Sequence, residues 1–215
     1  VDIPGRKIRT TLKVSKEKFK KGQIIYLVSN NFNKDSLESQ YIYEVNNNIL
    51  FNMAKKGMEI FADDGRLAFY IKDVFKEYIT LITKCDGFLQ ECKGINIPES
   101  FFDDKELNDK DKFFLDFCCD QKVDFVGISF VDNAEYLKNI QDHIGERHPR
   151  VISKIENSSA IQNLSGILKI SFAIMIDRGD LSVETKTSSI GILQKDILFE
   201  ANKFGVPVIV ATEML

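Results

Sequence analysis

The spacing of hydrophobic residues changes partway along the chain. Up to about residue 93, short runs rich in β-branched and aromatic residues alternate with Gly, Asn and Asp, which is typical of strands joined by tight turns. Asp63, Asp64 and Gly65 separate two such runs and suit a hairpin turn, because its central residues need positive φ. The pattern predicts a small β domain with strands within residues 20–30, 41–45, 58–71 and 77–91.

After Pro98, amphipathic stretches alternate with short apolar runs. The spacing predicts helices over residues 108–122, 132–144, 158–170 and 187–205, and strands over residues 123–130, 150–156, 172–179 and 206–215. Successive β-α units with right-handed crossovers form a parallel sheet that is buried on both faces. A strand fragment at residues 1–3 can open the series, so the β domain would be an insertion in it. These strands alone could not close an eight-stranded barrel.

Composition narrows the class of protein. Of the 215 residues 44% are hydrophobic, with only 12 Gly and 4 Pro, which excludes a fibrous or globally disordered chain. The 29 Lys and Arg residues nearly balance 32 Asp and Glu residues, so we expect no nucleic-acid surface. No apolar run approaches the roughly 20 residues of a membrane span and no leader opens the chain, so we expect no membrane association. A small-molecule ligand is favoured.

The cysteines do not indicate a metal site or a disulfide framework. Cys85, Cys92, Cys118 and Cys119 lack paired C-x-x-C spacing. We interpret them as buried small hydrophobic residues in a reducing cytoplasm, which predicts a cytoplasmic protein.

Candidate chemistry lies at the ends of the predicted parallel strands, where β/α folds gather their reactive side chains. Lys154 and Glu156 are two residues apart and therefore point to the same side of one strand. Asp180 follows Gly179 one β-α unit later, so its carboxylate can approach that of Glu156. Converging carboxylates suit Mg²⁺ or Mn²⁺, while an ion pair at the sheet edge is the structural alternative. The residues indicate a metal-dependent lyase, aldolase or phosphotransferase acting on a small carboxylate.

A family resemblance rests on several motifs in one order. The string VISKIENSSAI closely resembles the active-site signature of pyruvate kinases. The segments DIPGRKIRT, ADDGRL, CKGINIP, IDRGDLSVE, LQK and ATEML resemble further motifs of that family in the family's order. The resemblance spans nearly the whole chain.

The resemblance implies an α/β fold, namely a partial TIM-type (β/α)8 barrel with an inserted small β-barrel lid domain. Residues 1–10 would form a barrel strand end, residues 11–93 the lid, and residues 94–215 the β/α barrel segment. The lid would close over a nucleotide and exclude water.

The resemblance also implies an activity, the glycolytic transfer of a phosphoryl group from phosphoenolpyruvate to ADP that yields pyruvate and ATP. Glu156 and Asp180 would hold Mg²⁺ or Mn²⁺, and Lys154 would stabilise charge on the phosphoryl group and the enolate. The amides of Gly179 and Asp180 would bind the substrate carboxylate, and Thr212 would lie near the carbon that accepts a proton.

Two further pairs of positions match the family. Asp2 and the carbonyl of Ile3 match half of its potassium site, so K⁺ is a second expected cofactor. Arg9 and Lys93 match positions that contact the nucleotide phosphates.

The chain departs from the family pattern at several positions. Arg6 replaces a proline, Asp132 and Asn133 replace Arg-Lys, Asp177 replaces an alanine, Ser182 replaces a glycine, and Glu213 replaces a glutamine. Several of these changes add negative charge near the expected phosphate site. Asp177 could tighten metal binding and repel substrate, or it could pair with Arg178 or Lys154.

Three hypotheses for function follow. We favour a pyruvate kinase. A Mg²⁺-dependent pyruvate-enolate aldolase or lyase is an alternative, although Lys154 and the inserted domain argue against it. The third is a catalytically weakened relative that acts as a binding module, motivated by Asp132, Asp177 and Glu213. The family's eighth barrel strand and effector-binding domain are absent, which predicts either an excerpt of a longer protein or a reduced relative. Any homo-oligomer would form through regions outside this sequence.

Overall fold

The computed structural model describes residues 1–14, 17–98, 106–185 and 187–212. The chain divides into two compact units. One, the β-barrel unit, comprises Lys7–Ser100, and the other, the sheet unit, comprises Val1–Arg6 and Phe101–Leu215.

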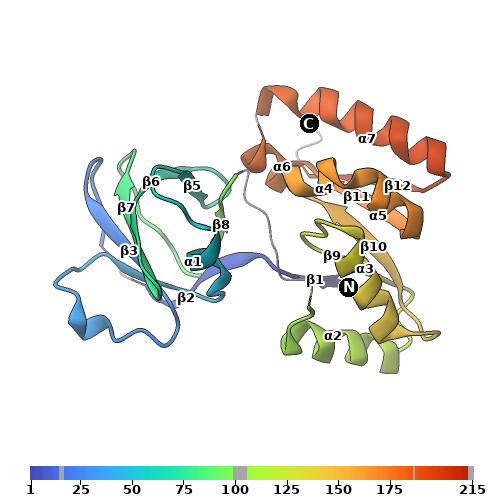
Figure 1. Cartoon of the computed structure of the whole chain (residues 1–215), viewed down its shortest axis with the longest axis horizontal. Coiled ribbons are helices and arrows are strands. Elements are labelled where there is room, and N and C mark those ends of the chain that lie inside the picture. The colour runs from blue at the N-terminus through green and yellow to red at the C-terminus, as the bar shows by residue number, and fades with distance from the viewer. Residues whose placement is uncertain (15–16, 99–105, 186, 213–215) are drawn as a thin grey trace. The chain divides into compact units, whose positions relative to one another are not determined.

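The β-barrel unit is a closed barrel with strand order β2-β4-β3-β7-β6-β5-β8 (Figure 1). Its elements are β2 (Ile8–Val14), β3 (Ile24–Val28), η1 (Lys34–Ser36), β4 (Ile42–Val45), α1 (Ile49–Met53), β5 (Glu59–Ala62), β6 (Leu67–Val74), β7 (Tyr78–Thr83) and β8 (Gly94–Asn96). The turn predicted between β5 and β6 is confirmed, because Asp63 and Asp64 have φ of 52° and 55°. The short helix α1 was not predicted.

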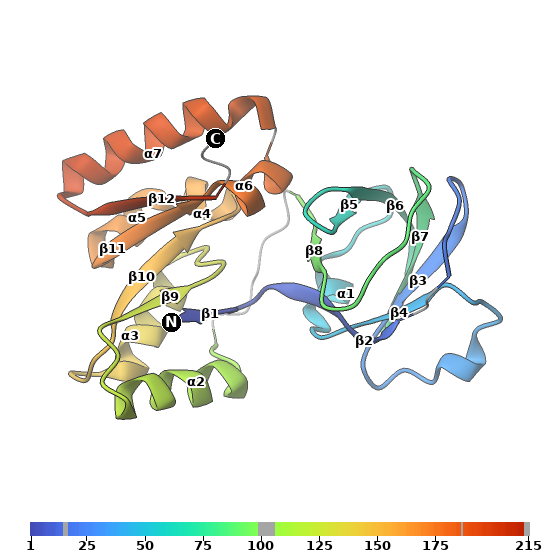
Figure 2. The same ribbon diagram turned by 180° about the vertical axis from the view of Figure 1, so that it is seen from behind.

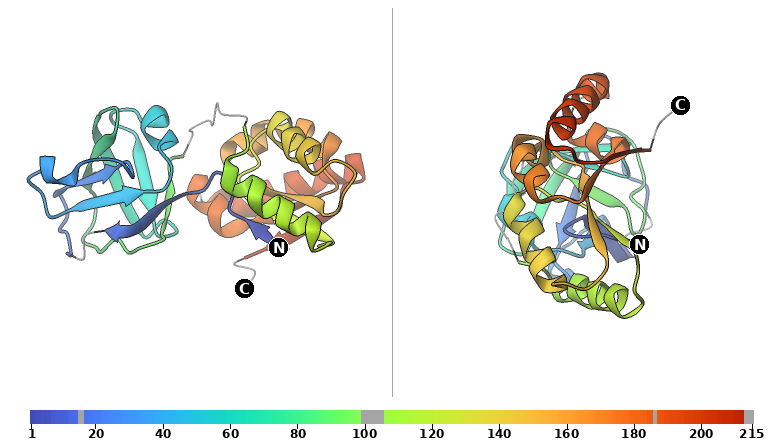
Figure 3. Two further views of the ribbon diagram at one scale, coloured as in Figure 1. Left: turned by 90° about the horizontal axis from the view of Figure 1, so that it is seen from below. Right: turned by 90° about the vertical axis from the view of Figure 1, so that its right-hand side faces the viewer.

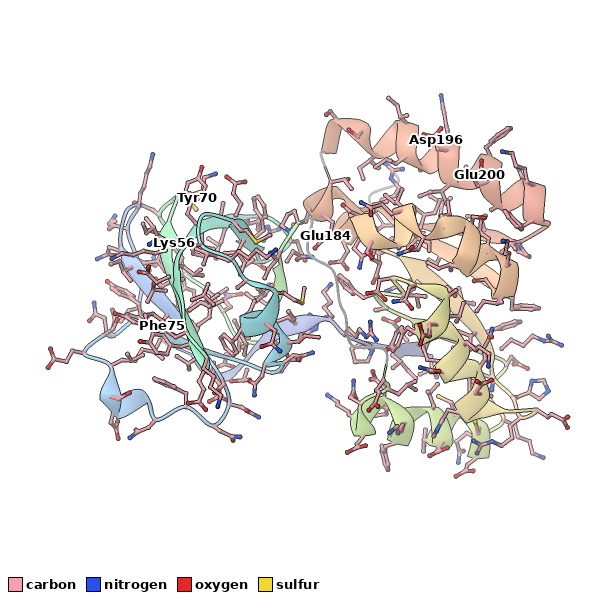
Figure 4. All side chains as sticks on the ribbon, viewed as in Figure 1. Lys56, Tyr70, Phe75, Glu184, Asp196 and Glu200 are labelled. Atoms are coloured by element: carbon pink, nitrogen blue, oxygen red, sulfur yellow. The ribbon has the colours of Figure 1, made fainter. Side chains whose placement is uncertain are left out.

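The barrel closes through its first and last strands. Ile8 pairs with Ile95 and Arg9 with Gly94, so this unit starts before residue 11 and ends after residue 93. Apolar side chains from all around the barrel fill its interior. Tyr70 and Phe75, labelled in Figure 4, are 42% and 45% exposed.

The sheet unit is built on five parallel strands in the order β1-β9-β10-β11-β12, seen side by side in Figure 2. The strands are β1 (Asp2–Ile3), β9 (Phe125–Ile128), β10 (Arg150–Ile155), β11 (Ala173–Asp177) and β12 (Val208–Ala211). The helical elements are α2 (Asp109–Asp120), α3 (Ala134–Ile144), α4 (Ser158–Gln162), α5 (Leu164–Ile170), α6 (Arg178–Glu184), η2 (Thr187–Ser189) and α7 (Ile190–Phe204). In Figure 3 the helices α2, α3, α5 and α7 follow one another along the outside of the sheet, which confirms the predicted α/β architecture.

Local sequence signals start and stop these helices. Asn108, Asn133 and Asn157 precede α2, α3 and α4, and each side chain accepts a hydrogen bond from a backbone amide of the first turn. Such caps satisfy amides that have no partner within the helix. The helix α7 ends at Phe204, one residue before the predicted end, and Gly205 closes it in a left-handed conformation.

Several predicted elements were wrong in their extent, including the strands predicted over residues 123–130 and 206–215, which are Phe125–Ile128 and Val208–Ala211 among the described residues. The single helix predicted over residues 158–170 is two helices, because Asn163 leaves helical geometry and its side-chain amide donates to the carbonyl of Asp132 at 2.9 Å. The strand predicted over residues 172–179 stops at Asp177, and Arg178 begins α6.

The interface between the sheet and its helices is apolar. Ile128, Ile155, Ile176, Leu137 and Ile167 belong to one buried cluster and are at most 1% exposed. Within the described residues, no helix combines the length and the apolar character needed to cross a bilayer.

The cysteine prediction was only partly right. Cys118 and Cys119 are buried, but Cys85 is half-buried and Cys92 is exposed. All four are free thiols.

Candidate active site

The carboxyl ends of neighbouring strands bring the predicted residues together. Parallel pairing sets Lys154 beside Met175 and Asp177 beside Ala211. Glu156 therefore follows β10 at the same edge of the sheet where β11 ends and Thr212 follows β12. The next helix, α6, carries Gly179 and Asp180 in its first turn. A hydrogen bond joins α6 to the start of α4, because the carbonyl of Glu184, labelled in Figure 4, accepts from the Ser158 hydroxyl at 3.2 Å.

Lys154 is the charged centre of this edge. Its Nζ lies 2.8 Å from Oε1 of Glu156, as expected for two side chains on one side of a strand, and 3.3 Å from Oδ2 of Asp177. The hydroxyl of Ser129 accepts from the same Nζ at 3.1 Å, and Oδ1 of Asp2 is 3.6 Å away. Only 10% of the lysine side chain is exposed. A simple ion pair does not describe this group, because one ammonium faces three carboxylates.

Burial and neighbouring charges perturb both members of the central pair. Burial lowers the pKa of the Lys154 ammonium, but nearby carboxylates, Glu156 first, outweigh burial and raise that pKa above its usual value. Burial raises the pKa of Glu156 to about 7, Lys154 opposes this shift, and Asp180 adds to it. The buried carboxylate of Glu156 thus lacks sufficient positive charge around it.

The donor set fits a hard divalent cation. Glu156, Asp177 and Asp180 each offer a carboxylate oxygen, and these oxygens lie within 4.8 Å of one another. Carboxylate oxygens are the ligands that Mg²⁺ and Mn²⁺ prefer. A cation there would offset the burial and the repulsion from Asp180 that raise the pKa of Glu156. The other Glu156 oxygen, Oε2, is fixed by the amide of Phe130 at 2.8 Å.

Asp177 contacts both the lysine and the threonine of the site. Its Oδ1 accepts a hydrogen bond from the Thr212 hydroxyl at 2.8 Å, in addition to the Lys154 contact. Burial raises the pKa of Asp177, but the Thr212 hydroxyl and Lys154 outweigh burial and hold that pKa below its usual value. Of the roles left open by the sequence, pairing with Lys154 is observed, and Asp177 also belongs to the carboxylate cluster.

The backbone around Gly179 is already engaged. Its amide, which the family resemblance assigns to the substrate carboxylate, donates to Oγ1 of Thr212 at 2.8 Å. The Ser182 hydroxyl donates to the Gly179 carbonyl at 2.8 Å. The resemblance's potassium position at Asp2 and Ile3 lies on β1, where the Ile3 carbonyl accepts from the Ser129 amide at 3.1 Å.

The two residues expected to bind nucleotide lie in the β-barrel unit. Arg9, on β2, donates to the carbonyl of Cys92 at 3.1 Å. Lys93 immediately precedes β8, and its Nζ lies 2.6 Å from Oδ1 of Asp63. About a third of the Lys93 side chain is exposed, at 31%.

The departures from the family pattern are partly compensated. Arg6 and Asp132 contact each other at 3.1 Å, and both side chains are buried. The negative charge that Asp132 adds is therefore paired with the positive charge of a second departure, Arg6. Glu213 lies outside the described residues.

Sequence reasoning placed Ser129 and Phe130 at a strand end but gave them no role. Both now contact the site, Ser129 through its hydroxyl and Phe130 through its amide. Phe130 has a φ of 56°, and such backbone geometry has no signal in the hydrophobic pattern.

Comparisons with known proteins agree on one family. A family model described as "Pyruvate kinase, barrel domain" matches residues 1–215. The chain is 33% identical to a protein named pyruvate kinase from Thermotoga maritima and 32% identical to one from Clostridium perfringens, covering 100% of this chain and 46% of each relative. A fungal pyruvate kinase, from Hypocrea jecorina, is 33% identical over 83% of this chain and 34% of its own length. The chain thus spans about half the length, or less, of these curated relatives.

Proposed function

Because the chain belongs to the pyruvate kinase family, we propose that the full-length protein transfers the phosphoryl group of phosphoenolpyruvate to ADP. The P–O bond to the enol oxygen breaks, a new P–O bond forms at the terminal phosphate of ADP, and the enolate takes a proton at its methylene carbon to become pyruvate. The observation that carries the proposal is the buried Lys154 among the converging carboxylates of Glu156 and Asp177.

The carboxylate cluster is the proposed site of Mg²⁺ or Mn²⁺. Glu156 and Asp180 would hold the ion, and the position of Asp177 makes it a third candidate ligand. A divalent ion held there supplies positive charge against the phosphoryl and carboxylate oxygens of the substrate. The Phe130 amide donates a hydrogen bond to Oε2 of Glu156 and so keeps this carboxylate oriented.

Lys154 is the proposed electrostatic catalyst. Its charge is secured by its neighbours and its position by the Ser129 hydroxyl. A fixed ammonium stabilises charge that grows on the phosphoryl group and the enolate oxygen in the transition state. Binding of the substrate carboxylate by the Gly179 amide requires that amide to exchange the Thr212 oxygen for a substrate oxygen.

The nucleotide and K⁺ sites are assigned only from positions of this chain that match the motifs of the family. We assign Arg9 and Lys93 to the nucleotide phosphates, and Asp2 with the carbonyl of Ile3 to K⁺. For Lys93, phosphate binding competes with its ion pair to Asp63. We also propose a cytoplasmic location, which the four free thiols support.

The test is pyruvate formation by the full-length protein with Mg²⁺, with and without ADP. We expect ADP-dependent pyruvate formation that Glu156→Gln and Asp180→Asn each abolish. Pyruvate formation without ADP would favour the aldolase or lyase alternative, and a folded protein that binds Mg²⁺ yet forms no pyruvate would favour the binding module. As a matched control, Glu200→Gln on α7 (Figure 4) removes a carboxylate outside the cluster and should leave turnover unchanged.

A further inference from the structure

Two residues that depart from the family pattern form one buried ion pair. Nη1 of Arg6 lies 3.1 and 3.3 Å from the two carboxylate oxygens of Asp132, although the residues are 126 positions apart. Their side chains are 5% and 1% exposed. The Arg6 guanidinium also lies over the ring of Tyr136, 3.8 Å from its centroid. A planar guanidinium stacked on an aromatic ring and paired with a carboxylate has a fixed position.

The pair fastens the loop between β9 and α3, which we define as residues 129–133. Within it, Asn133 donates to Oδ1 of Asp132 at 3.0 Å. Asn163, the residue that follows α4, donates from its side-chain amide to the Asp132 carbonyl at 2.9 Å. Asp132 is therefore held through both its side chain and its backbone.

The same loop positions the two charged residues of the active site. Ser129 contributes its hydroxyl to Lys154, and Phe130 contributes its amide to Glu156. Phe130 presents this amide from a backbone with a φ of 56°. Residues with a side chain rarely adopt such a φ, so the surrounding structure must enforce it.

Arg6 directly follows Gly5, whose backbone lies against the 129–133 loop. A Cβ at Gly5 would lie 2.3 Å from the carbonyl oxygen of Ser129. The backbone at Ile3 and Gly5 thus packs directly on the loop, and the Arg6–Asp132 contact joins the two segments.

We propose that the Arg6–Asp132 ion pair is a positioning device, which holds the 129–133 loop so that Ser129 and Phe130 orient Lys154 and Glu156. The expected effect on turnover rests on the proposed function, whereas the expected effect on metal affinity does not. Arg6, Asp132 and Tyr136 do not contact the substrate in this scheme. They act through the loop, as outer residues around metal ligands commonly do.

The experiment compares Arg6→Met with wild-type full-length protein. Mn²⁺ affinity is read from the electron paramagnetic resonance signal of free Mn²⁺, and kcat and the KM for phosphoenolpyruvate are measured in parallel. The matched control is Lys138→Met, which removes one partner of an exposed ion pair with Asp142 at 2.6 Å on α3. All affinities are measured well below the unfolding temperature of each variant.

We expect Arg6→Met to weaken Mn²⁺ binding and to lower kcat, each about tenfold, as is usual when a residue that orients a metal ligand is lost. Lys138→Met should stay within twofold of wild type in both. A purely structural ion pair would lower the unfolding temperature and leave Mn²⁺ affinity unchanged, and that result would overturn the inference.

A second variant keeps the test decisive if Arg6→Met does not fold. Asp132→Asn preserves the shape of the side chain and one acceptor oxygen but removes the charge that holds Arg6. We expect at least threefold weaker Mn²⁺ binding, and affinity equal to wild type would refute the positioning role. Absence of pyruvate formation in wild type would sink the proposed function alone, because the Mn²⁺ comparison does not depend on turnover.

Discussion

Replacing Gly5 by alanine should disturb the active site through the backbone of Ser129. Gly5 has a φ of 55°, and a Cβ added there would lie 2.3 Å from the Ser129 carbonyl oxygen, a backbone atom that no rotamer change can move away. The carbonyl belongs to the same peptide unit as the Phe130 amide that binds Glu156. A shift that relieves the clash therefore also moves this amide.

The magnitude has two parts. Left-handed backbone costs an alanine about 1–2 kcal/mol relative to glycine, and forcing an extra methyl into a packed site costs about 1–3 kcal/mol. Gly205 isolates the first part, because its φ of 66° and ψ of 24° are left-handed and nothing lies within 4 Å of a Cβ added there. The clash at Gly5 should thus add about 1–3 kcal/mol beyond Gly205→Ala, or roughly 5 °C in unfolding temperature for a domain of this size.

The assay is differential scanning fluorimetry of the full-length protein, combined with Mn²⁺ titration. We expect Gly205→Ala to lower the unfolding temperature by a few degrees, as about 1 kcal/mol implies, with unchanged Mn²⁺ affinity. Gly5→Ala should lower it further and weaken Mn²⁺ binding. Equal effects of the two substitutions would refute the close approach between Gly5 and the loop that orients Glu156.

Three other substitutions test separate steps. Lys154→Met should lower kcat by about 100-fold or more while isothermal titration still detects phosphoenolpyruvate, and a loss of affinity alone would contradict its role in the transition state. Asp177→Ala should raise the Mg²⁺ concentration for half-maximal activity about tenfold if Asp177 is a ligand, and an unchanged Mg²⁺ requirement would show that it only pairs with Lys154 and Thr212. Burial raises the pKa of Asp111 to about 6, so the folded state binds this proton more tightly than the unfolded state and stability is lost as pH rises through 6. Asp111→Asn should therefore be more stable than wild type at pH 8, by up to roughly 3 kcal/mol, with the advantage gone near pH 4 in urea titrations, and a difference that does not vary with pH would exclude this cause.

Much of the fold and part of the candidate site follow from local patterns. Alternating apolar runs and amphipathic stretches predict β-α units, and parallel strands bring their carboxyl ends to one edge. That rule alone selected Lys154, Glu156 and Asp180, which the structure brings together. The turn at Asp63 was predictable because its chemistry is local.

The remaining features depend on contacts between distant segments. The break at Asn163 needs a hydrogen bond to Asp132, 31 positions away. Arg6 and Asp132 look like separate departures in the sequence, and only the packing of β1 beside β9 makes them a pair. The strained backbone of Phe130 has no sequence signal, because a phenylalanine ordinarily avoids that conformation.

The central claim is that Lys154 and the carboxylate cluster direct a phosphoryl group from phosphoenolpyruvate to ADP. Phosphorus-31 nuclear magnetic resonance of the full-length protein with both substrates and Mg²⁺ follows that group directly. We predict that the phosphoenolpyruvate resonance declines while the γ-phosphate resonance of ATP grows by an equal amount. Growth of inorganic phosphate alone, or an unchanged phosphoenolpyruvate resonance, would contradict the account.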